Sequence, residues 1–102
     1  MSATTFQTSS FQAIDPTTGL AFGDQIAEMS ASDVSGLISK AVATKSAFSA
    51  TTPKERAAAL RAIGESIEAA REKLIEITMK ETALPNGRLT GELSRTVFQL
   101  EQ

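Results

Sequence analysis

The charged side chains of the C-terminal half are the residues whose spacing could support chemistry. Glu76 and Glu81 could serve as a general acid and general base pair, but a spacing of five does not bring them side by side on a helix. Glu76 and Lys80 are four residues apart, which favours an ordinary surface pair. Arg88 and Arg95 share a helix face and could grip an anion, although solvent or salt-bridge contact is the commoner role of such residues. No catalytic constellation follows from these positions.

Glycines and aromatic residues do not supply a ligand site either. Gly87 and Gly91 lack a preceding strand, the dinucleotide-binding spacing and the P-loop lysine. Phe48 and Phe98 are expected in the core rather than against a ligand. We therefore assign no catalytic, cofactor-binding or metal-binding residue within the chain.

Composition removes whole classes of function. The sequence contains no cysteine and no histidine. Disulfides, thiolate metal sites, a cysteine nucleophile and a histidine base are thus excluded within this chain. The 12 acidic and 10 basic residues leave a net charge of −2, which gives no general attraction to nucleic acid or to an anionic membrane. We expect neither as a partner.

The 102 residues suffice for one small domain. Residues 1–10 are rich in Ser and Thr and carry no basic side chain, so they predict a disordered leader rather than a secretory signal. No apolar run approaches the length of a membrane span. These features favour a soluble protein of the cytoplasm.

The remaining sequence predicts a mainly α fold of about four helices, preceded by a short β-hairpin or two extended arms. The turn Asp15-Pro16-Thr17-Thr18-Gly19 separates the two extended pieces, Phe11–Ile14 and Leu20–Ala27. Helices are expected over residues 31–49, over 53–82 with a break near Ala69–Glu72, and from Pro85 to the end. One uninterrupted helix over 53–82 is the alternative.

The stretch from Thr52 to Thr82 organises this arrangement. Thr52-Pro53-Lys54-Glu55 predicts a helix start with a reciprocal cap, and Ser30 with Asp33 predicts another. Behind the first start an apolar stripe recurs at alternating spacings of three and four, which places it on one side of a helix. Its members are Leu60, Ile63, Ile67, Ala70, Leu74 and Ile77. The stripe requires something to pack against.

Three short pieces in order carry a resemblance to a known family. They are Ile14-Asp15-Pro16-Thr17-Thr18-Gly19, Thr52-Pro53-Lys54-Glu55-Arg56-Ala57 and Glu81-Thr82-Ala83-Leu84-Pro85. Together they resemble the N-terminal segment of the aldehyde dehydrogenase superfamily, over about residues 11–102. Within it, Leu84-Pro85, Arg88-Leu89, Gly91-Glu92, Arg95-Thr96 and Gln99-Leu100 look like the branch of 2-oxoglutarate-semialdehyde (2,5-dioxovalerate) dehydrogenases. Ala83, Asn86-Gly87 and Ser94 depart from that pattern.

The resemblance implies a fragment of the α/β aldehyde dehydrogenase fold, with residues 11–102 as an incomplete part of its nucleotide-binding region. In that family a cysteine forms a thiohemiacetal, hydride passes to NAD or NADP, and the thioester is hydrolysed to the acid. None of the family's catalytic or cofactor positions falls in this chain. The cofactor is therefore expected for the full-length parent and not for this chain alone. The implied partners are the remainder of the subunit and, in full length, further copies of it.

A different class of function is also open. The stripe from Leu60 to Ile77 could make this chain a stand-alone helical interaction or oligomerisation module. Continuation of the reading frame beyond Gln102 into a Gly-rich βαβ unit and a later cysteine would favour the enzyme, whereas a stop codon there would favour the module. The helix at Gln102 lacks a stop signal, which leads us to expect a fragment.

Overall fold

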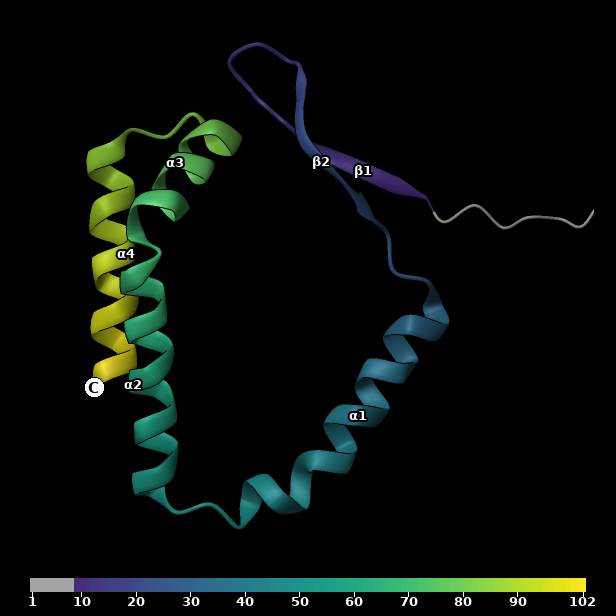
Figure 1. The fold of residues 1–102 in the computed structure, drawn as a ribbon, viewed down its shortest axis with the longest axis vertical. Coiled ribbons are helices and arrows are strands. Elements are labelled where there is room, and N and C mark those ends of the chain that lie inside the picture. The colour runs from purple at the N-terminus through teal and green to yellow at the C-terminus, as the bar shows by residue number, and fades with distance from the viewer. Residues whose placement is uncertain (1–8) are drawn as a thin grey trace, which may run out of the picture. The chain divides into compact units, whose positions relative to one another are not determined.

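The computed structural model describes residues 9–102. This part of the chain forms a two-stranded hairpin followed by four helices, as the sequence predicted (Figure 1). In order, the elements are β1 (Ser10–Ile14), β2 (Ala21–Ala27), α1 (Ala31–Ser49), α2 (Pro53–Ala69), α3 (Arg71–Thr82) and α4 (Asn86–Glu101). They group into two compact units, one of residues 9–13 with 21–50 and one of residues 14–20 with 51–102. Of the predicted leader, residues 1–8 lie outside the described part, and Ser10 already belongs to β1.

The hairpin turn is held by hydrogen bonds to the side chain and to the backbone of Asp15. Its Oδ1 accepts a hydrogen bond from the Thr17 N–H at 2.8 Å, and its carbonyl accepts one from the Gly19 N–H at 2.8 Å. Gly19 has φ of 72°, which only a residue without a Cβ adopts at low cost. The Asp15 N–H donates to the Leu20 carbonyl at 2.9 Å. Of the two arrangements that the sequence left open, a hairpin or two extended arms, the structure has the hairpin.

Helix α1 begins at the predicted reciprocal cap. The Asp33 N–H donates to Ser30 Oγ at 3.1 Å, and the Ser30 N–H donates to Asp33 Oδ2 at 3.0 Å. The hydrogen bond from the Ser30 backbone N–H to the Asp33 carboxylate, followed by the interaction of that carboxylate with the Ser30 hydroxyl, holds the pKa of Asp33 below its usual value. Apolar side chains along the helix stay exposed: Val34, Leu37, Ile38, Val42 and Phe48. The first unit therefore leaves the apolar face of α1 open.

Helix α2 begins with the second predicted cap. The Glu55 N–H donates to Thr52 Oγ1 at 3.1 Å, and the Thr52 N–H donates to Glu55 Oε1 at 3.3 Å. Arg56 adds a bond from Nη1 to the Thr51 carbonyl at 2.6 Å. The side chains of the entry segment thus fix the place where the helix starts.

A single residue, Ala70, separates α2 from α3. Its φ of −98° and ψ of 9° leave the helical range, while its N–H still bonds the Ser66 and Ile67 carbonyls at 3.2 and 3.1 Å. The Ala70 carbonyl accepts from the Leu74 N–H at 2.9 Å and so starts α3. The break lies within the predicted range. Stripe residues lie on both sides of this break.

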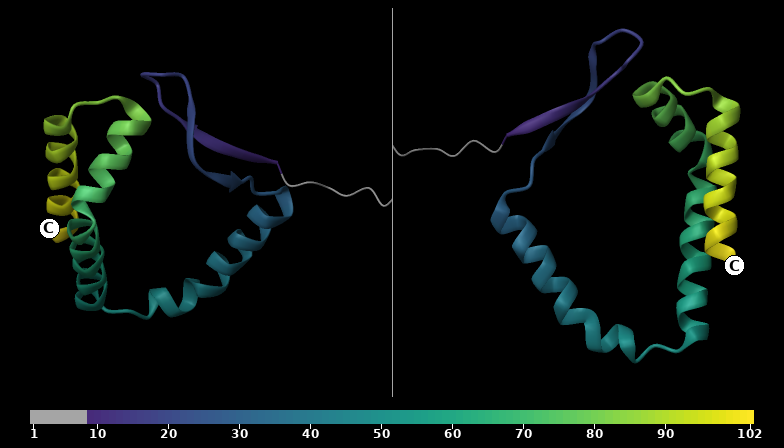
Figure 2. Two further views of the ribbon diagram at one scale, coloured as in Figure 1. Left: turned by 45° about the horizontal axis from the view of Figure 1, so that its top comes forward. Right: turned by 180° about the vertical axis from the view of Figure 1, so that it is seen from behind.

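The core of the second unit lies where α4 runs antiparallel beside α2 and also contacts α3 (Figure 2). Among residues 9–102, the buried apolar side chains are Ile75, Leu89 and Val97. Gly64 of α2 is buried as well, and a Cβ built there would lie 3.7 Å from Leu100 Cβ and 3.8 Å from Val97 Cγ1. The space beside Gly64 is thus wide enough for a methyl group, and α4 packs directly against this position.

The connection from α3 to α4 carries a strained residue. Ala83 ends α3 in the left-handed conformation, with φ of 60° and ψ of 17°, while its N–H bonds the Met79 carbonyl at 2.8 Å. Pro85 has extended backbone and caps α4, whose first residue is Asn86. The sequence predicts Pro85 as the first residue of this helix. The structure places it one position earlier, with its carbonyl accepting from the Leu89 N–H at 3.2 Å.

Replacing Ala83 tests the strain at this connection. Ala83→Gly should stabilise the helical unit by about 1 kcal/mol, because a Cβ in the left-handed region costs roughly that much. Ala83→Val should destabilise it, since a branched side chain fits that region worse. Thermal unfolding followed by circular dichroism measures both. An equal or lower midpoint for the glycine variant would contradict the assigned conformation.

The packing of α2 on α4 yields a second prediction. Gly64→Ala should be stabilising by up to about 1 kcal/mol, because its Cβ meets only ordinary contacts and alanine favours helices. Gly64→Leu should separate the helices and lower the unfolding midpoint. Gly91 is the matched control, since nothing lies within 4 Å of a Cβ there. The prediction fails if Gly64→Leu unfolds at the same temperature as Gly91→Leu.

Candidate functional site

The charged residues that the sequence singled out do not converge on one point. Glu76, Lys80 and Glu81 lie on exposed positions of α3. Arg88 donates from Nε to Glu92 Oε1 at 3.1 Å within α4, which is the salt-bridge role weighed from the sequence. Arg95 is exposed two turns further along that helix. The two arginines thus lie on one helix, but Arg88 is held by a carboxylate.

The two glycines lie in the first turns of α4. Gly87 and Gly91 follow the Leu84-Pro85 connection rather than a strand, and a Cβ at either position would meet open space. A phosphate-binding loop needs glycine for close backbone approach after a strand. This geometry therefore does not form a nucleotide cradle.

The prediction that Phe48 and Phe98 are core residues is wrong within the described structure. Phe48 is 64% exposed and Phe98 is 56% exposed. Phe98 follows the buried Val97, so it points about 100° away from the face that packs on α2. Phe48 belongs to the open face of α1. Both side chains add to the exposed apolar surface of their units.

Within residues 9–102, no group of three or more His, Cys, Asp and Glu side chains is placed to hold a metal ion. None of the helices in that range has both the length and the apolar character needed to cross a bilayer.

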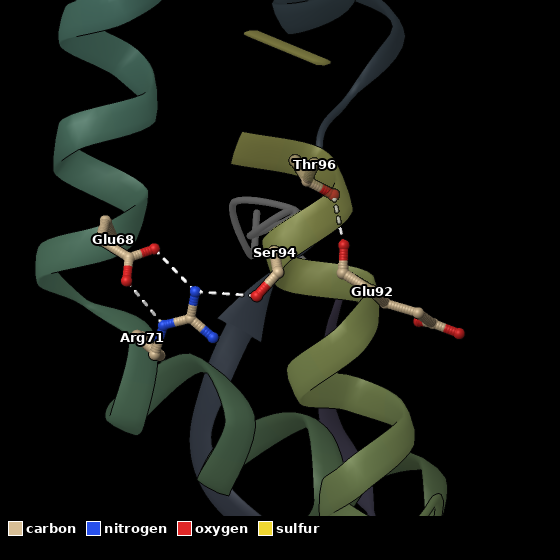
Figure 3. Close-up of polar contacts among 5 residues, drawn as sticks. All are labelled: Glu68, Arg71, Glu92, Ser94 and Thr96. Carbon is tan, nitrogen blue, oxygen red and sulfur yellow. Dashed lines mark hydrogen bonds and ion pairs between the residues drawn. The ribbon is translucent and has the colours of Figure 1, made fainter. Parts of the chain in front are cut away.

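The polar cluster that the structure does build centres on Arg71, which the sequence analysis did not single out (Figure 3). Its Nε and Nη2 donate to the two carboxylate oxygens of Glu68, both at 2.8 Å. The same Nη2 donates to Ser94 Oγ on α4 at 3.1 Å. Arg71, the first residue of α3, therefore links this helix to the last turn of α2 through Glu68 and to α4 through Ser94.

This pairing shifts the titration of both partners. The hydrogen bond from Arg71 lowers the pKa of Glu68, and the same bond raises the pKa of Arg71. Glu68 and Arg71 are three residues apart, a spacing that could have flagged the pair in the sequence. The bond to Ser94 spans 23 residues, and local spacing does not reveal it. The cluster holds helices together rather than activating a nucleophile.

An open apolar groove lies along α2 and the start of α3. It has a volume of about 430 Å³ and is lined by Ala62, Ile63, Ser66, Ile67, Ala70 and Leu74. Ile63 is 50% exposed and Leu74 is 40% exposed. Four of the six stripe residues predicted from the sequence thus line the groove. Apolar surface of this kind, free of charged groups, suits packing rather than catalysis.

Comparison with known proteins identifies the family. The model of the aldehyde dehydrogenase family matches residues 3–102. The chain belongs to the aldehyde dehydrogenase family, whose full-length members are oxidoreductases that generally use NAD or NADP. No solved structure matches the chain. The family assignment made from the three sequence pieces is thereby confirmed.

Substituting Arg71 tests the cluster and its pH dependence. Because the pKa of Glu68 is lowered in the folded chain, the pair stabilises fully above the carboxyl's ordinary pKa, and this contribution is lost as pH falls through the lowered value. Arg71→Ala should therefore lower the unfolding midpoint at neutral pH, with the difference from wild type shrinking in acid. In the same variant the pKa of Glu68, followed by NMR, should rise toward its ordinary value.

Arg88→Ala is the control, because the arginine that it removes pairs with Glu92 of the same helix. It should have the smaller effect on the unfolding midpoint. An equal loss in both variants, or a Glu68 titration that Arg71→Ala leaves unchanged, would refute a tie between helices.

Proposed function

We propose that this chain is the N-terminal helical part of an NAD(P)-dependent aldehyde dehydrogenase subunit and that its role there is structural. The subunit oxidises an aldehyde to its carboxylic acid. The hairpin and helices supply packing surface for the nucleotide-binding region, of which residues 11–102 form an incomplete part. The chain alone is catalytically inert.

The observation that carries this proposal is the exposed apolar surface of the helices. In α2 and α3 it comprises Leu60, Ile63, Leu74, Ile77 and Met79, and in α1 it comprises the five residues given above. Each large apolar side chain moved from water into a packed interior gains about 1.5–3 kcal/mol. Helix faces left open to this extent therefore favour further contacts, which we assign to the remainder of the subunit.

Catalysis must come from residues outside this chain. The sequence has no cysteine to act as the nucleophile of the family. The described residues also do not fit a nicotinamide cofactor, because the glycines of α4 follow a turn and no Gly-rich strand-to-helix connection is present in residues 9–102. We derive no catalytic step from this chain.

The finer assignments rest on the resemblance of α4. The pairs Arg88-Leu89, Gly91-Glu92 and Arg95-Thr96 support 2-oxoglutarate semialdehyde as the substrate. We further propose that the full-length subunit works as a homo-oligomer in the cytoplasm.

The exposed faces also favour a second candidate, a stand-alone helical interaction or oligomerisation module. In that case the groove on α2 and α3 would bind another protein or a second copy. The two candidates differ in what the gene encodes after Gln102: a Gly-rich βαβ unit and a catalytic cysteine for the enzyme, or a stop codon for the module.

An activity assay tests the enzyme directly. A full-length product of the gene should reduce NAD or NADP with 2-oxoglutarate semialdehyde, and faster than with an aldehyde that lacks carboxylates. Residues 1–102 alone should give no reduction with either aldehyde. Turnover by the isolated chain would refute inertness, and equal rates on both aldehydes would refute the substrate assignment while leaving the family intact.

A charge in the groove tests its role as a packing surface. Ile63→Glu should sharply lower the yield of folded full-length subunit, because an unpaired carboxylate would be buried when the groove is covered. The same change should have little effect on the helicity of residues 1–102, where Ile63 is exposed. Ala58→Glu, at an exposed position of α2 outside the groove, is the matched control. A full-length Ile63→Glu subunit as soluble and active as the control would rule out a covered groove.

A further inference from the structure

We draw no further inference here: the strongest candidate, the open apolar groove along α2 and α3, belongs to the packing surface already proposed, and nothing in the described residues shows what covers it.

Discussion

Close packing of α4 on α2 at Gly64 is the contact on which the helical unit depends. A Cβ built at that position would lie at ordinary contact distance from Val97 and Leu100 of α4. Leu89 and Val97 are then buried on the inner face of α4, and Ile75 is buried in α3. A residue much larger than alanine at Gly64, such as leucine, would hold the helices apart and expose this small core.

The break at Ala70 determines which apolar residues reach that core. Because the chain turns there, Ile75 faces α4 while Leu74 and Ile77 remain partly open to solvent. Arg71 fixes the turn from the polar side, since it bonds both Glu68 and Ser94. The same turn leaves a groove lined by residues on either side of it. One backbone irregularity thus produces both the core and the open surface.

The proposed function gives this open surface a reason. A subunit that joins several domains must bury apolar faces between them, and helices whose faces are incompletely covered meet that need. The chemistry of the family requires a cysteine, which this sequence does not contain. The proposed role of residues 9–102 is accordingly to provide packing surface.

The sequence by itself determined the order of the elements and most of their limits. Ser30 with Asp33 and Thr52 with Glu55 mark two helix starts through bonds between residues three apart, and the Asp15–Gly19 turn likewise depends on neighbours. Such local chemistry acts whatever the rest of the chain does. It was sufficient for the hairpin, for the helices and for the break near Ala70.

Only the tertiary structure decided which side chains those helices bury. Periodicity grouped the residues from Leu60 to Ile77 on one helix face, but most of them remain exposed. The buried residues are instead Ile75, Leu89 and Val97, where α4 packs against α2 and α3. Phe48 and Phe98 were assigned to the core by type alone and lie exposed. Burial depends on contacts between residues far apart in sequence, and the spacing within one helix does not contain them.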